Sequence, residues 1–341
     1  EAYAKWAAES VKHFKGRNVL WEIWNEPNVA FWHGTGGLNS VQFADQYVAL
    51  VKKAVPAMRV ADPDCYILAG SVSCLWRDSF RWIDEAFMQG LLSSGINALS
   101  VHPYGYPHPE LCIENGRPEE GYKLLREKMV KAGAPKDFPV LNSEVGYSRT
   151  DRNVGPQHLA AEHQAMLFVR TYLLDLMENI QLTIWYNWDG DGGHEVRGAT
   201  GARPVYNACN NLVAELAGYH FVERLQGGSN QDFVLAFEND SKRRKIVAWT
   251  TPSGRDDSPD KARTHEVKIP TGTTDGPLPV RDLFGRGIRT KVVEGSVGVT
   301  LSSSPQYIEC VTLTTPLVGL DKPGLEFKTR AGGANPAPQT V

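Results

Sequence analysis

Residues 19–28 read Val-Leu-Trp-Glu-Ile-Trp-Asn-Glu-Pro-Asn, an apolar strand that ends in Asn-Glu-Pro. Glu26 stands where this strand stops, because Pro27 has no backbone N–H and cannot continue a sheet ladder. A second apolar strand, within residues 138–147, delivers Glu144 to its carboxyl end in the same way. Two glutamates that each end an apolar strand are therefore the features from which fold and function are predicted.

Short apolar strands alternate with helical patterns from residue 1 to about residue 217. The expected strands cover 19–24, 66–72, 98–104, 138–144 and 182–188, and the expected helices cover 40–55, 78–93, 119–132, 156–178 and 205–216. Strands separated by helices at this spacing form right-handed βαβ units and a parallel sheet. In a barrel of such strands the carboxyl ends form the active face, so Glu26 and Glu144 are expected on one face.

The hydrophobic period changes to two residues after residue 217. Apolar residues alternate with others there, for example at 233/235/237 and 297/299/301, and turn clusters separate these runs. The pattern predicts an antiparallel β-sandwich over residues 218–320, following an α/β domain over residues 1–217. Residues 321–341 form a C-terminal tail rich in Gly and Pro, a composition typical of a loose segment.

Composition excludes several classes of partner. The chain of 341 residues has a net charge of −3 and no long basic run, so nucleic acid is not an expected partner. No stretch approaches the roughly 18–20 apolar residues of a membrane helix, so no membrane partner is expected. The five cysteines include no C-x-x-C pair, which argues against a disulfide framework or a zinc knuckle. No phosphate-binding loop, nucleophile elbow or dinucleotide fingerprint is present, so no cofactor is expected. Residues 189–194 read Asp-Gly-Asp-Gly-Gly-His but lack the remaining ligand positions of a calcium loop, so no metal is expected.

Aromatic residues are abundant, with nine Trp and twelve Tyr. Indole rings stack against the C–H-rich faces of sugars, but they also pack in ordinary cores, and composition leaves both interpretations open. The paired carboxylates favour sugar chemistry. Two carboxyl groups about 5–5.5 Å apart form the catalytic pair of a retaining glycosidase, in which one is protonated and donates to the leaving oxygen while the other is ionised and attacks the anomeric carbon.

The two strand ends resemble clan A glycoside hydrolases, through Trp-Asn-Glu-Pro-Asn at 24–28 and Ser-Glu-Val-Gly at 143–146. Within that clan the first segment is most similar to family 39 β-xylosidases and related bacterial polysaccharide hydrolases. The resemblance covers about residues 1–217 and implies a (β/α)8 TIM barrel. It makes Glu26 the acid/base at the end of strand four and Glu144 the nucleophile at the end of strand seven. It also implies that Asn25 hydrogen-bonds the sugar 2-hydroxyl.

The strand before the one that carries Glu144 ends in Ser-Val-His-Pro-Tyr-Gly, residues 100–105. In the families that this chain resembles, a His-x-Tyr at this place lies in the pocket, and its Tyr can hydrogen-bond the nucleophile. The resemblance therefore implies that His102 and Tyr104 bind substrate or support the catalytic pair. The rival interpretation is a pair of satisfied side chains at the rim of the barrel.

Aromatic residues on the last strand are candidates for a platform beneath the bound sugar, which the clan commonly has at this place. Trp185 and Trp188 are three residues apart, so in a regular strand their rings face opposite sides. Trp185 is the one we predict in the pocket, with core packing as the rival interpretation. Trp32 and His33, just past the acid/base strand, are further candidates for lining a sugar subsite.

The chain departs from the family pattern before Glu26. Three strands should precede strand four and occupy roughly 90–100 residues, whereas the 18 residues before this strand suffice for one helix. The barrel is therefore predicted to be incomplete, without strands one to three. Three explanations stay open: the chain is an excerpt of a longer protein, a partner subunit or the tail covers the open side, or the incomplete barrel functions alone. Because an open parallel sheet exposes its edge and its apolar interior, we predict a homo-oligomer that covers this side.

These observations predict a retaining β-glycosidase that hydrolyses β-linked oligosaccharides by double displacement with two glutamates. A β-galactosidase, β-glucosidase or β-xylosidase type fits, and we favour exo action. The alternative is a non-catalytic carbohydrate-binding protein derived from a glycoside hydrolase; the presence of both carboxylates favours the enzyme. A structural module of a larger assembly is a third interpretation. The chain begins at Glu1 without a signal peptide and leaves both a cytoplasmic and a secreted location open.

Overall fold

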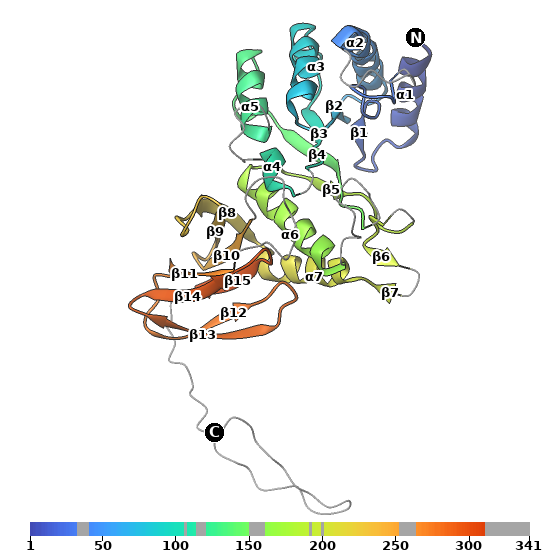
Figure 1. Cartoon of the computed structure of the whole chain (residues 1–341). Coiled ribbons are helices and arrows are strands. Elements are labelled where there is room, and N and C mark those ends of the chain that lie inside the picture. The colour runs from blue at the N-terminus through green and yellow to red at the C-terminus, as the bar shows by residue number, and fades with distance from the viewer. Residues whose placement is uncertain are drawn as a thin grey trace, which may run out of the picture.

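The computed structural model of the chain describes residues 1–32, 41–105, 108–113, 121–149, 161–190, 193–198, 201–251 and 264–310. Two large sheets organise these residues (Figure 1). The first is parallel and lies beside a set of helices, and the second is antiparallel and carries the later part of the chain. Among the helices described, none has the length and apolar character needed to cross a bilayer.

The parallel sheet contains five strands, and neighbours in the sheet are neighbours in the chain. Its order is β1 (Leu20–Glu22), β2 (Tyr66–Ser73), β3 (Ala98–His102), β4 (Val140–Val145) and β5 (Thr183–Trp185), with parallel pairing throughout. Helices connect the strands, as the βαβ prediction requires. This curled sheet is a partial TIM barrel, which confirms the predicted class of fold for this part of the chain.

Seven helices are present among the described residues. They are α1 (Ala2–His13), α2 (Ala44–Ala61), which follows the 3₁₀ turn Val41–Phe43, α3 (Arg77–Met88), α4 (Glu110–Ile113), α5 (Gly121–Lys131), α6 (Ala161–Met177) and α7 (Pro204–Leu216). In Figure 1, α1, α2, α3 and α5 stand in a row along the sheet, and α6 and α7 lie between β5 and the antiparallel sheet. The helix predicted over 156–178 is described from Ala161 onward.

Alternation along the strands divides their side chains between two faces. Ile67 and Ala69 of β2 belong to the large core beneath the helices, whereas Leu68 between them belongs to a small cluster on the other face. Ala98 of β3 and Leu141 of β4 complete the buried part of that small cluster. The helix-covered face therefore supplies most of the apolar burial, and the inner face of the curled sheet has only a small core.

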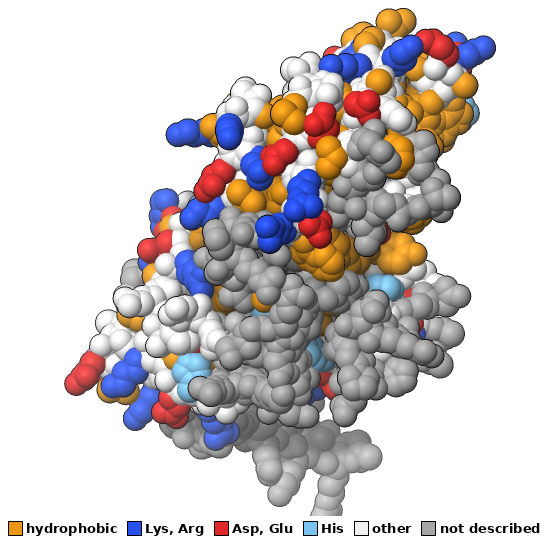
Figure 2. Space-filling model, turned by 45° about the horizontal axis from the view of Figure 1, so that its top comes forward, with side chains coloured by type: hydrophobic (Ala, Val, Ile, Leu, Met, Phe, Trp, Pro, Cys, Tyr) orange, Lys and Arg blue, Asp and Glu red, His pale blue; other side chains and the backbone are white. Residues whose placement is uncertain are grey.

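Strands β1 and β5 are the two edges of the parallel sheet within the described ranges. Leu20 of β1 is 46% exposed and Ile184 of β5 is 47% exposed. Trp6 of α1 and Phe14, which follows this helix, are exposed as well, and Figure 2 shows hydrophobic side chains gathered at the end of the molecule that carries α1. An unpaired strand edge flanked by apolar side chains is a surface that another segment can cover.

The antiparallel sheet begins soon after α7, with two residues between the end of this helix and the start of β8. Its strands are β8 (Tyr219–Arg224), β9 (Asp232–Asn239), β10 (Arg244–Thr250), β11 (His265–Pro270), β12 (Gly276–Arg281), β13 (Gly287–Val293), β14 (Ser296–Leu301) and β15 (Gln306–Cys310), in the order β11-β14-β13-β12-β15-β10-β9-β8. Strands far apart in this order, such as β9 and β14, contribute side chains to the same apolar core. The single sheet therefore folds over on itself around that core. The predicted tail 321–341 lies outside the described residues. A short ribbon, β6 (Arg197–Gly198) and β7 (Gly201–Ala202), precedes α7.

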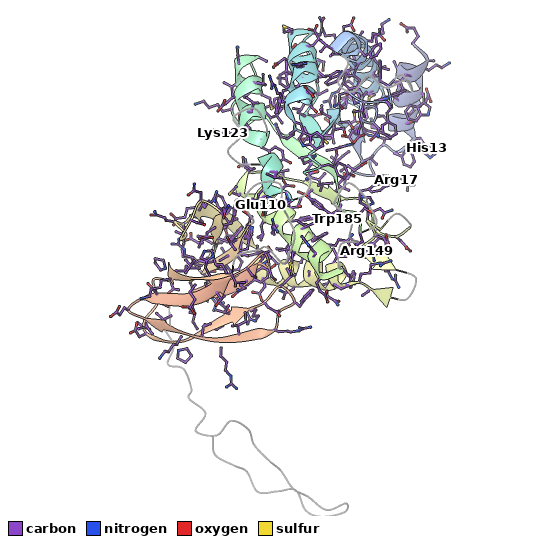
Figure 3. All side chains as sticks on the ribbon, in the orientation of Figure 1. His13, Arg17, Glu110, Lys123, Arg149 and Trp185 are labelled. Carbon is purple, nitrogen blue, oxygen red and sulfur yellow. The ribbon has the colours of Figure 1, made fainter. Side chains whose placement is uncertain are left out.

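A buried charged cluster joins the partial barrel to the antiparallel sheet. Glu110 of α4, labelled in Figure 3, is 1% exposed. Its Oε1 accepts hydrogen bonds from Nε of Arg170 on α6 at 2.7 Å and from Nε1 of Trp249 on β10 at 2.8 Å. Burial would raise the pKa of the Glu110 carboxyl, but Arg170 and His108 hold this pKa well below its usual range. The cluster therefore fixes the β-domain against the helices of the barrel.

Candidate active site

Glu26 follows β1 in a tightly held loop. Its φ of 42° lies in the left-handed region, which is uncommon for a residue with a side chain and needs support from neighbours. Asn28 supplies that support: its Nδ2 donates to the Ser73 carbonyl at 3.0 Å, and its Oδ1 accepts the Ser73 N–H at 2.9 Å. The Glu26 N–H is directed to Oγ of Ser71 at 3.4 Å. The loop is thus bound to the end of β2, and Glu26 is only 8% exposed.

A bulge in β2 creates the place for this loop. Gly70 has a φ of 118°, and a Cβ at this position would lie 2.6 Å from the Ser100 carbonyl oxygen, so only glycine fits. Tyr47 of α2 stabilises the bulge: its hydroxyl donates to the Ile23 carbonyl at 3.0 Å and accepts the Gly70 N–H at 2.8 Å. An extra residue in a strand changes the face on which the following side chains lie. The bulge therefore directs the Ser71 side chain toward His102 and the loop that carries Glu26.

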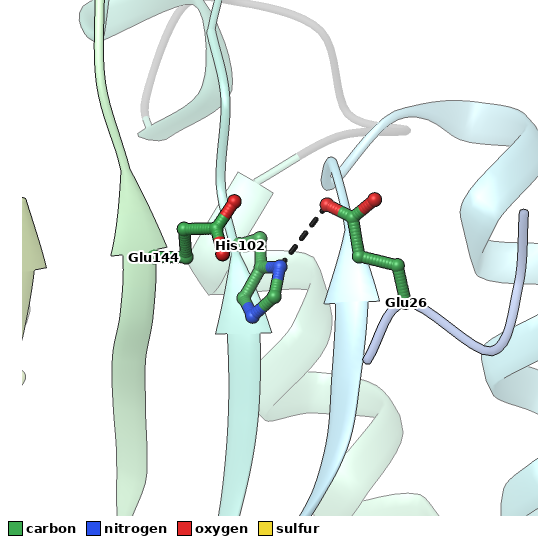
Figure 4. Close-up of side chains that lie close together, drawn as sticks. All are labelled: Glu26, His102 and Glu144. Carbon is green, nitrogen blue, oxygen red and sulfur yellow. Dashed lines mark hydrogen bonds and ion pairs between the residues drawn. The ribbon is translucent and has the colours of Figure 1, made fainter. Parts of the chain in front are cut away.

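His102, the last residue of β3, contacts the first of the two glutamates. Its Nδ1 lies 3.0 Å from Oε1 of Glu26, and its Nε2 lies 3.2 Å from Oγ of Ser71 (Figure 4). The ring is 1% exposed, so both ring nitrogens make their contacts away from water. Two residues further on, the Tyr104 hydroxyl donates to Oε1 of Glu144 at 2.9 Å. Residues at and just after the end of β3 therefore contact both glutamates.

Glu144 lies near the end of β4, where pairing with β5 changes register between Asn142 and Val145. In a regular strand Asn142 and Glu144 would share a face. Here Asn142 points toward α6 while Glu144 meets Tyr104, and the side chain of Ser143 donates to Oε1 of Glu22 at 2.7 Å. The irregularity therefore lets two successive side chains of β4 reach the inner side of the sheet.

The two glutamates and the histidine form one compact group. One oxygen of each carboxylate and one nitrogen of His102 lie within 4.8 Å of one another, and in Figure 4 His102 stands between Glu26 and Glu144. Two carboxylates and an imidazole are also donors that a divalent transition metal accepts. The two carboxyl groups lie in different environments, because Glu26 contacts an imidazole and Glu144 contacts a phenol.

Asp175 of α6 lies behind this site and joins β4 to β5. Asn142 Nδ2 and Thr183 Oγ1 each donate to its Oδ2 at 2.7 Å. The carboxyl is buried, and this burial raises its pKa to about 6 despite the hydrogen bonds that it accepts. Because Asn142 is two residues before Glu144, Asp175 anchors the strand that carries the second glutamate.

Trp185, predicted to line the pocket, lies on the helix-facing side of β5. This residue, labelled in Figure 3, is 9% exposed. Its ring packs against Phe168 of α6 with ring centroids 4.8 Å apart. Alternation along β5 is the reason, since Trp185 shares the helix-facing side with Thr183. The exposed aromatic residues after β5 are instead Tyr186, at 46%, and Trp188, at 58%. The burial of Trp185 favours the rival interpretation, core packing, and a contact of its ring with a sugar stays a prediction.

The remaining candidates lie around Glu26. Asn25 is exposed next to it, so its amide is accessible to a ligand. Trp32 is partly buried and meets the ring of Trp24 edge to face at 5.2 Å, so it supports the loop from one side. His33 lies outside the described residues. The sugar contacts predicted for Asn25 and Trp32 stay predictions.

Sequence reasoning missed Ser71, Asn28 and Asp175. An isolated glycine inside an apolar strand, as at Gly70, is a known signal of a bulge and points to the residue after it. Asn28 stands in the quoted strand end, but nothing in the sequence tells which strand it binds. Asp175 has no signal at all, because an acidic residue within a helix is ordinarily exposed.

Comparison with known proteins shows which class has this fold. The partial barrel, with its glutamates at strand ends and a β-domain behind it, has the fold of the clan A glycoside hydrolases. The resemblance drawn from the two sequence segments, to that clan and most to family 39, is thereby confirmed at the level of the fold. No protein-family model matches the sequence, and no curated protein does.

Three solved structures illustrate the likeness. A family 39 glycoside hydrolase from the gut symbiont Bacteroides cellulosilyticus WH2 matches with a TM-score of 0.69 and 23% identity, over 89% of this chain and 60% of that one. A GH39 β-xylosidase from Caulobacter crescentus matches at 0.57 and 15%, over 90% and 71%. A GH30 endoxylanase from Clostridium papyrosolvens C71 matches at 0.55 and 14%, over 90% and 70%. This chain thus spans about 60% of the length of the first of these proteins.

Proposed function

We propose that this chain carries the catalytic centre of a retaining β-glycosidase that hydrolyses β-linked oligosaccharides. The observation that carries the proposal is the spacing of Glu26 and Glu144, which have oxygens within 4.8 Å of each other. Retaining glycosidases hold their two carboxyl groups about 5–5.5 Å apart, whereas inverting enzymes need about 6.5–9.5 Å to admit a water molecule. The observed spacing supports the retaining arrangement.

In the proposed first step Glu144 attacks the anomeric carbon while Glu26 donates its proton to the leaving oxygen. The carbon–oxygen bond of the leaving group breaks, and a glycosyl ester forms on Glu144. In the second step Glu26, now ionised, takes a proton from water, and the water oxygen displaces Glu144. The Tyr104 hydrogen bond supports the role of Glu144, since it holds one carboxylate oxygen and leaves the other available. Asn25 is proposed to bind the sugar 2-hydroxyl.

The proposed substrates are β-galactosides, β-glucosides or β-xylosides, cleaved by exo action from the end of short oligosaccharides. The exposed rings of Tyr186 and Trp188 support a sugar ligand, because aromatic faces stack on the C–H groups of sugars. A β-xyloside is the first substrate to test, since a β-xylosidase and an endoxylanase are among the proteins of similar fold. The alternative, a non-catalytic carbohydrate-binding protein, is less favoured because both glutamates keep hydrogen-bonded partners.

We also propose that a second copy of the chain covers the open side of the partial barrel. The exposed Leu20 and Ile184 on the edge strands β1 and β5 support this interface. Analytical ultracentrifugation of the chain is expected to show a dimer or a larger oligomer, and Ile184→Arg is expected to shift it toward the monomer. A stable monomer at all concentrations would contradict this proposal and would favour a cover from further polypeptide in the same protein.

The decisive experiment is hydrolysis of nitrophenyl β-xyloside, β-glucoside and β-galactoside by the wild type, Glu26→Ala and Glu144→Ala. Partly exposed Glu238→Ala is the matched control, because its partner is a surface lysine of the β-domain. We expect wild-type turnover of at least one glycoside, full activity of the control and near-complete loss in both site variants. Azide is expected to restore the activity of Glu26→Ala and to give a β-glycosyl azide, because azide replaces the water that the acid/base activates. In Glu144→Ala azide replaces the nucleophile itself, so the expected product is the α-glycosyl azide. Binding without turnover would instead support the carbohydrate-binding alternative.

A further inference from the structure

We infer that Ser71 is a positioning residue for the acid/base glutamate, because its hydroxyl fixes His102 in the tautomer that carries hydrogen on Nδ1. The inference rests on the proposed role of Glu26 and deepens it. Ser71 comes from the bulge of β2, His102 from the end of β3 and Glu26 from the loop after β1, so three successive segments of the sheet contribute. Ser71 is fully buried.

The hydrogen-bonding capacity of the Ser71 hydroxyl determines whether it donates to His102 or accepts from it. A hydroxyl has one hydrogen to donate and two lone pairs to accept. The Glu26 backbone N–H, 3.4 Å from Oγ, can only donate, so it occupies a lone pair. The Ser71 hydrogen needs an acceptor, since a buried donor without a partner is costly. Among the described residues, Nε2 of His102 at 3.2 Å is the acceptor that contacts Oγ.

The tautomer of His102 follows from this direction. A neutral imidazole carries one hydrogen, so if Nε2 accepts from Ser71, the hydrogen resides on Nδ1. Nδ1 then donates to Oε1 of Glu26 at 3.0 Å. The opposite tautomer would place a lone pair of Nδ1 against a carboxylate oxygen. His102 keeps its proton in both chemical steps: Glu26 alone gives a proton to the leaving group and later takes one from water.

The consequence is a hydrogen bond that favours the ionised form of Glu26 once its proton has left. Without the Ser71 hydroxyl, His102 is free to move its hydrogen to Nε2, and Nδ1 can then accept a hydrogen bond from the protonated Glu26. Ser71 would thus act on Glu26 through His102 and without touching the substrate.

Ser100 provides a matched control in the same bulge. Its side chain is also fully buried, and its Oγ accepts the backbone N–H of Ser71 at 2.9 Å. Ser71→Ala and Ser100→Ala each delete one buried hydroxyl at the junction of β2 and β3. Only the first deletes the contact with His102. A role confined to the stability of the bulge would affect both variants alike.

The test is ¹⁵N NMR of the protein labelled in its histidine rings, with His102 assigned from a His102→Asn spectrum. We expect hydrogen on Nδ1 of His102 in the wild type and in Ser100→Ala, and a shift toward the Nε2–H tautomer in Ser71→Ala. Hydrogen on Nε2 in the wild type would overturn the inference, even if Ser71→Ala fails to fold. This readout needs no substrate, so it remains decisive if the protein proves to have no glycosidase activity.

Kinetics supply the second readout. On the glycoside that the wild type turns over, Ser71→Ala is expected to lower kcat/KM by about tenfold, the size of one hydrogen bond to a charged group. Ser100→Ala should lower it less. An unchanged kcat/KM in Ser71→Ala, or an equal loss in both variants, would contradict the positioning role.

Discussion

The Tyr104 hydroxyl lies 2.9 Å from Oε1 of Glu144 and donates a hydrogen bond to it. The same strand end holds His102 against the other glutamate, Glu26. One strand thus gives the two carboxyl groups different partners, a phenol and an imidazole. Because pairs of titratable groups in different environments take on different roles in catalysis, this relationship is the basis for assigning one glutamate as nucleophile and the other as acid/base.

Tyr104→Phe removes the hydrogen bond to Glu144 and preserves the ring. A hydrogen bond to a charged group contributes about 1.5–3 kcal/mol, so kcat/KM is expected to fall by about 10- to 150-fold. The melting temperature should change little, because Tyr104 is only half-buried. Tyr219→Phe, on a β-domain strand far along the chain, is the control for loss of a phenol. Unchanged kcat/KM in Tyr104→Phe would contradict a role of this contact in the reaction.

Zinc is expected to inhibit the proposed glycosidase, whereas EDTA should leave turnover unchanged. Glu26, His102 and Glu144 offer two oxygens and one nitrogen within 4.8 Å, and a bound cation would occupy the groups that the proposed reaction needs. Isothermal titration should show weaker zinc binding by His102→Asn than by the wild type, and Mg²⁺ should have little effect because it prefers oxygen ligands. Loss of turnover in EDTA would point to a metal-dependent reaction and against the two-glutamate mechanism.

Asp175 is expected to make the protein less stable as the pH rises. Its folded-state pKa of about 6 exceeds the ordinary 3.8, so the folded protein binds more protons than the unfolded chain between these values. The free energy of unfolding should therefore decrease by roughly 2 kcal/mol from pH 4 to pH 8 through this group. Urea titrations of the wild type and Asp175→Asn should show that their difference depends on pH, whereas exposed Asp240→Asn should follow the wild type. A pH-independent difference would contradict the shifted pKa.

Glu110→Gln should destabilise the junction between the barrel and the β-domain. It leaves the charge of Arg170 buried without its partner, a change that typically costs about 3–5 kcal/mol. Because the folded-state pKa of Glu110 is lowered, its stabilising effect is present above about pH 4.3 and decreases as the pH falls below that value. Thermal unfolding by circular dichroism measures both effects. Glu238→Gln, from a surface pair, should leave stability nearly unchanged, and an equally small effect of Glu110→Gln would refute the prediction.

Trp185 and Tyr186 should separate stability from substrate binding. Trp185→Ala removes a buried ring and is expected to lower the free energy of unfolding by about 3–5 kcal/mol. Tyr186→Ala removes an exposed ring and is expected to raise KM by about two- to tenfold with little change in stability, since ring stacking contributes about 0.5–1.5 kcal/mol. Urea unfolding and initial rates with the best aryl glycoside measure the two effects. A stable Trp185→Ala with a raised KM would restore the original pocket prediction.

Local patterns in the sequence were sufficient for the succession of strands and helices. The alternation of apolar strands with helical stretches predicted a parallel sheet, and the change to a period of two after residue 217 predicted the antiparallel one. Glu26 and Glu144 could be placed at strand ends because a proline or a loop terminates each apolar run. These features depend on neighbours within a few residues, which the sequence displays directly.

The face on which each side chain lies was decided by the tertiary structure. Trp185 was predicted in the pocket, but regular alternation along β5 turns it toward Phe168 of α6. In β2 and β4 the register is irregular, and this irregularity directs the side chains of Ser71 and Glu144 toward the candidate site. Because the side-chain period of a strand is two, one extra residue inverts every later assignment, and a single sequence does not reveal where that residue is inserted.

The sequence by itself determined the two glutamates, the order of the elements and the resemblance to a clan A fold. Only the tertiary structure decided that Glu26 and Glu144 approach within 4.8 Å, that His102 and Ser71 stand beside the first, and that Asp175 anchors the strand of the second. The physical reason is separation along the chain, because Glu26 and Glu144 are 118 positions apart in the sequence. Their distance in space is set by strand pairing and by the bulges, which depend on the packing of the whole sheet.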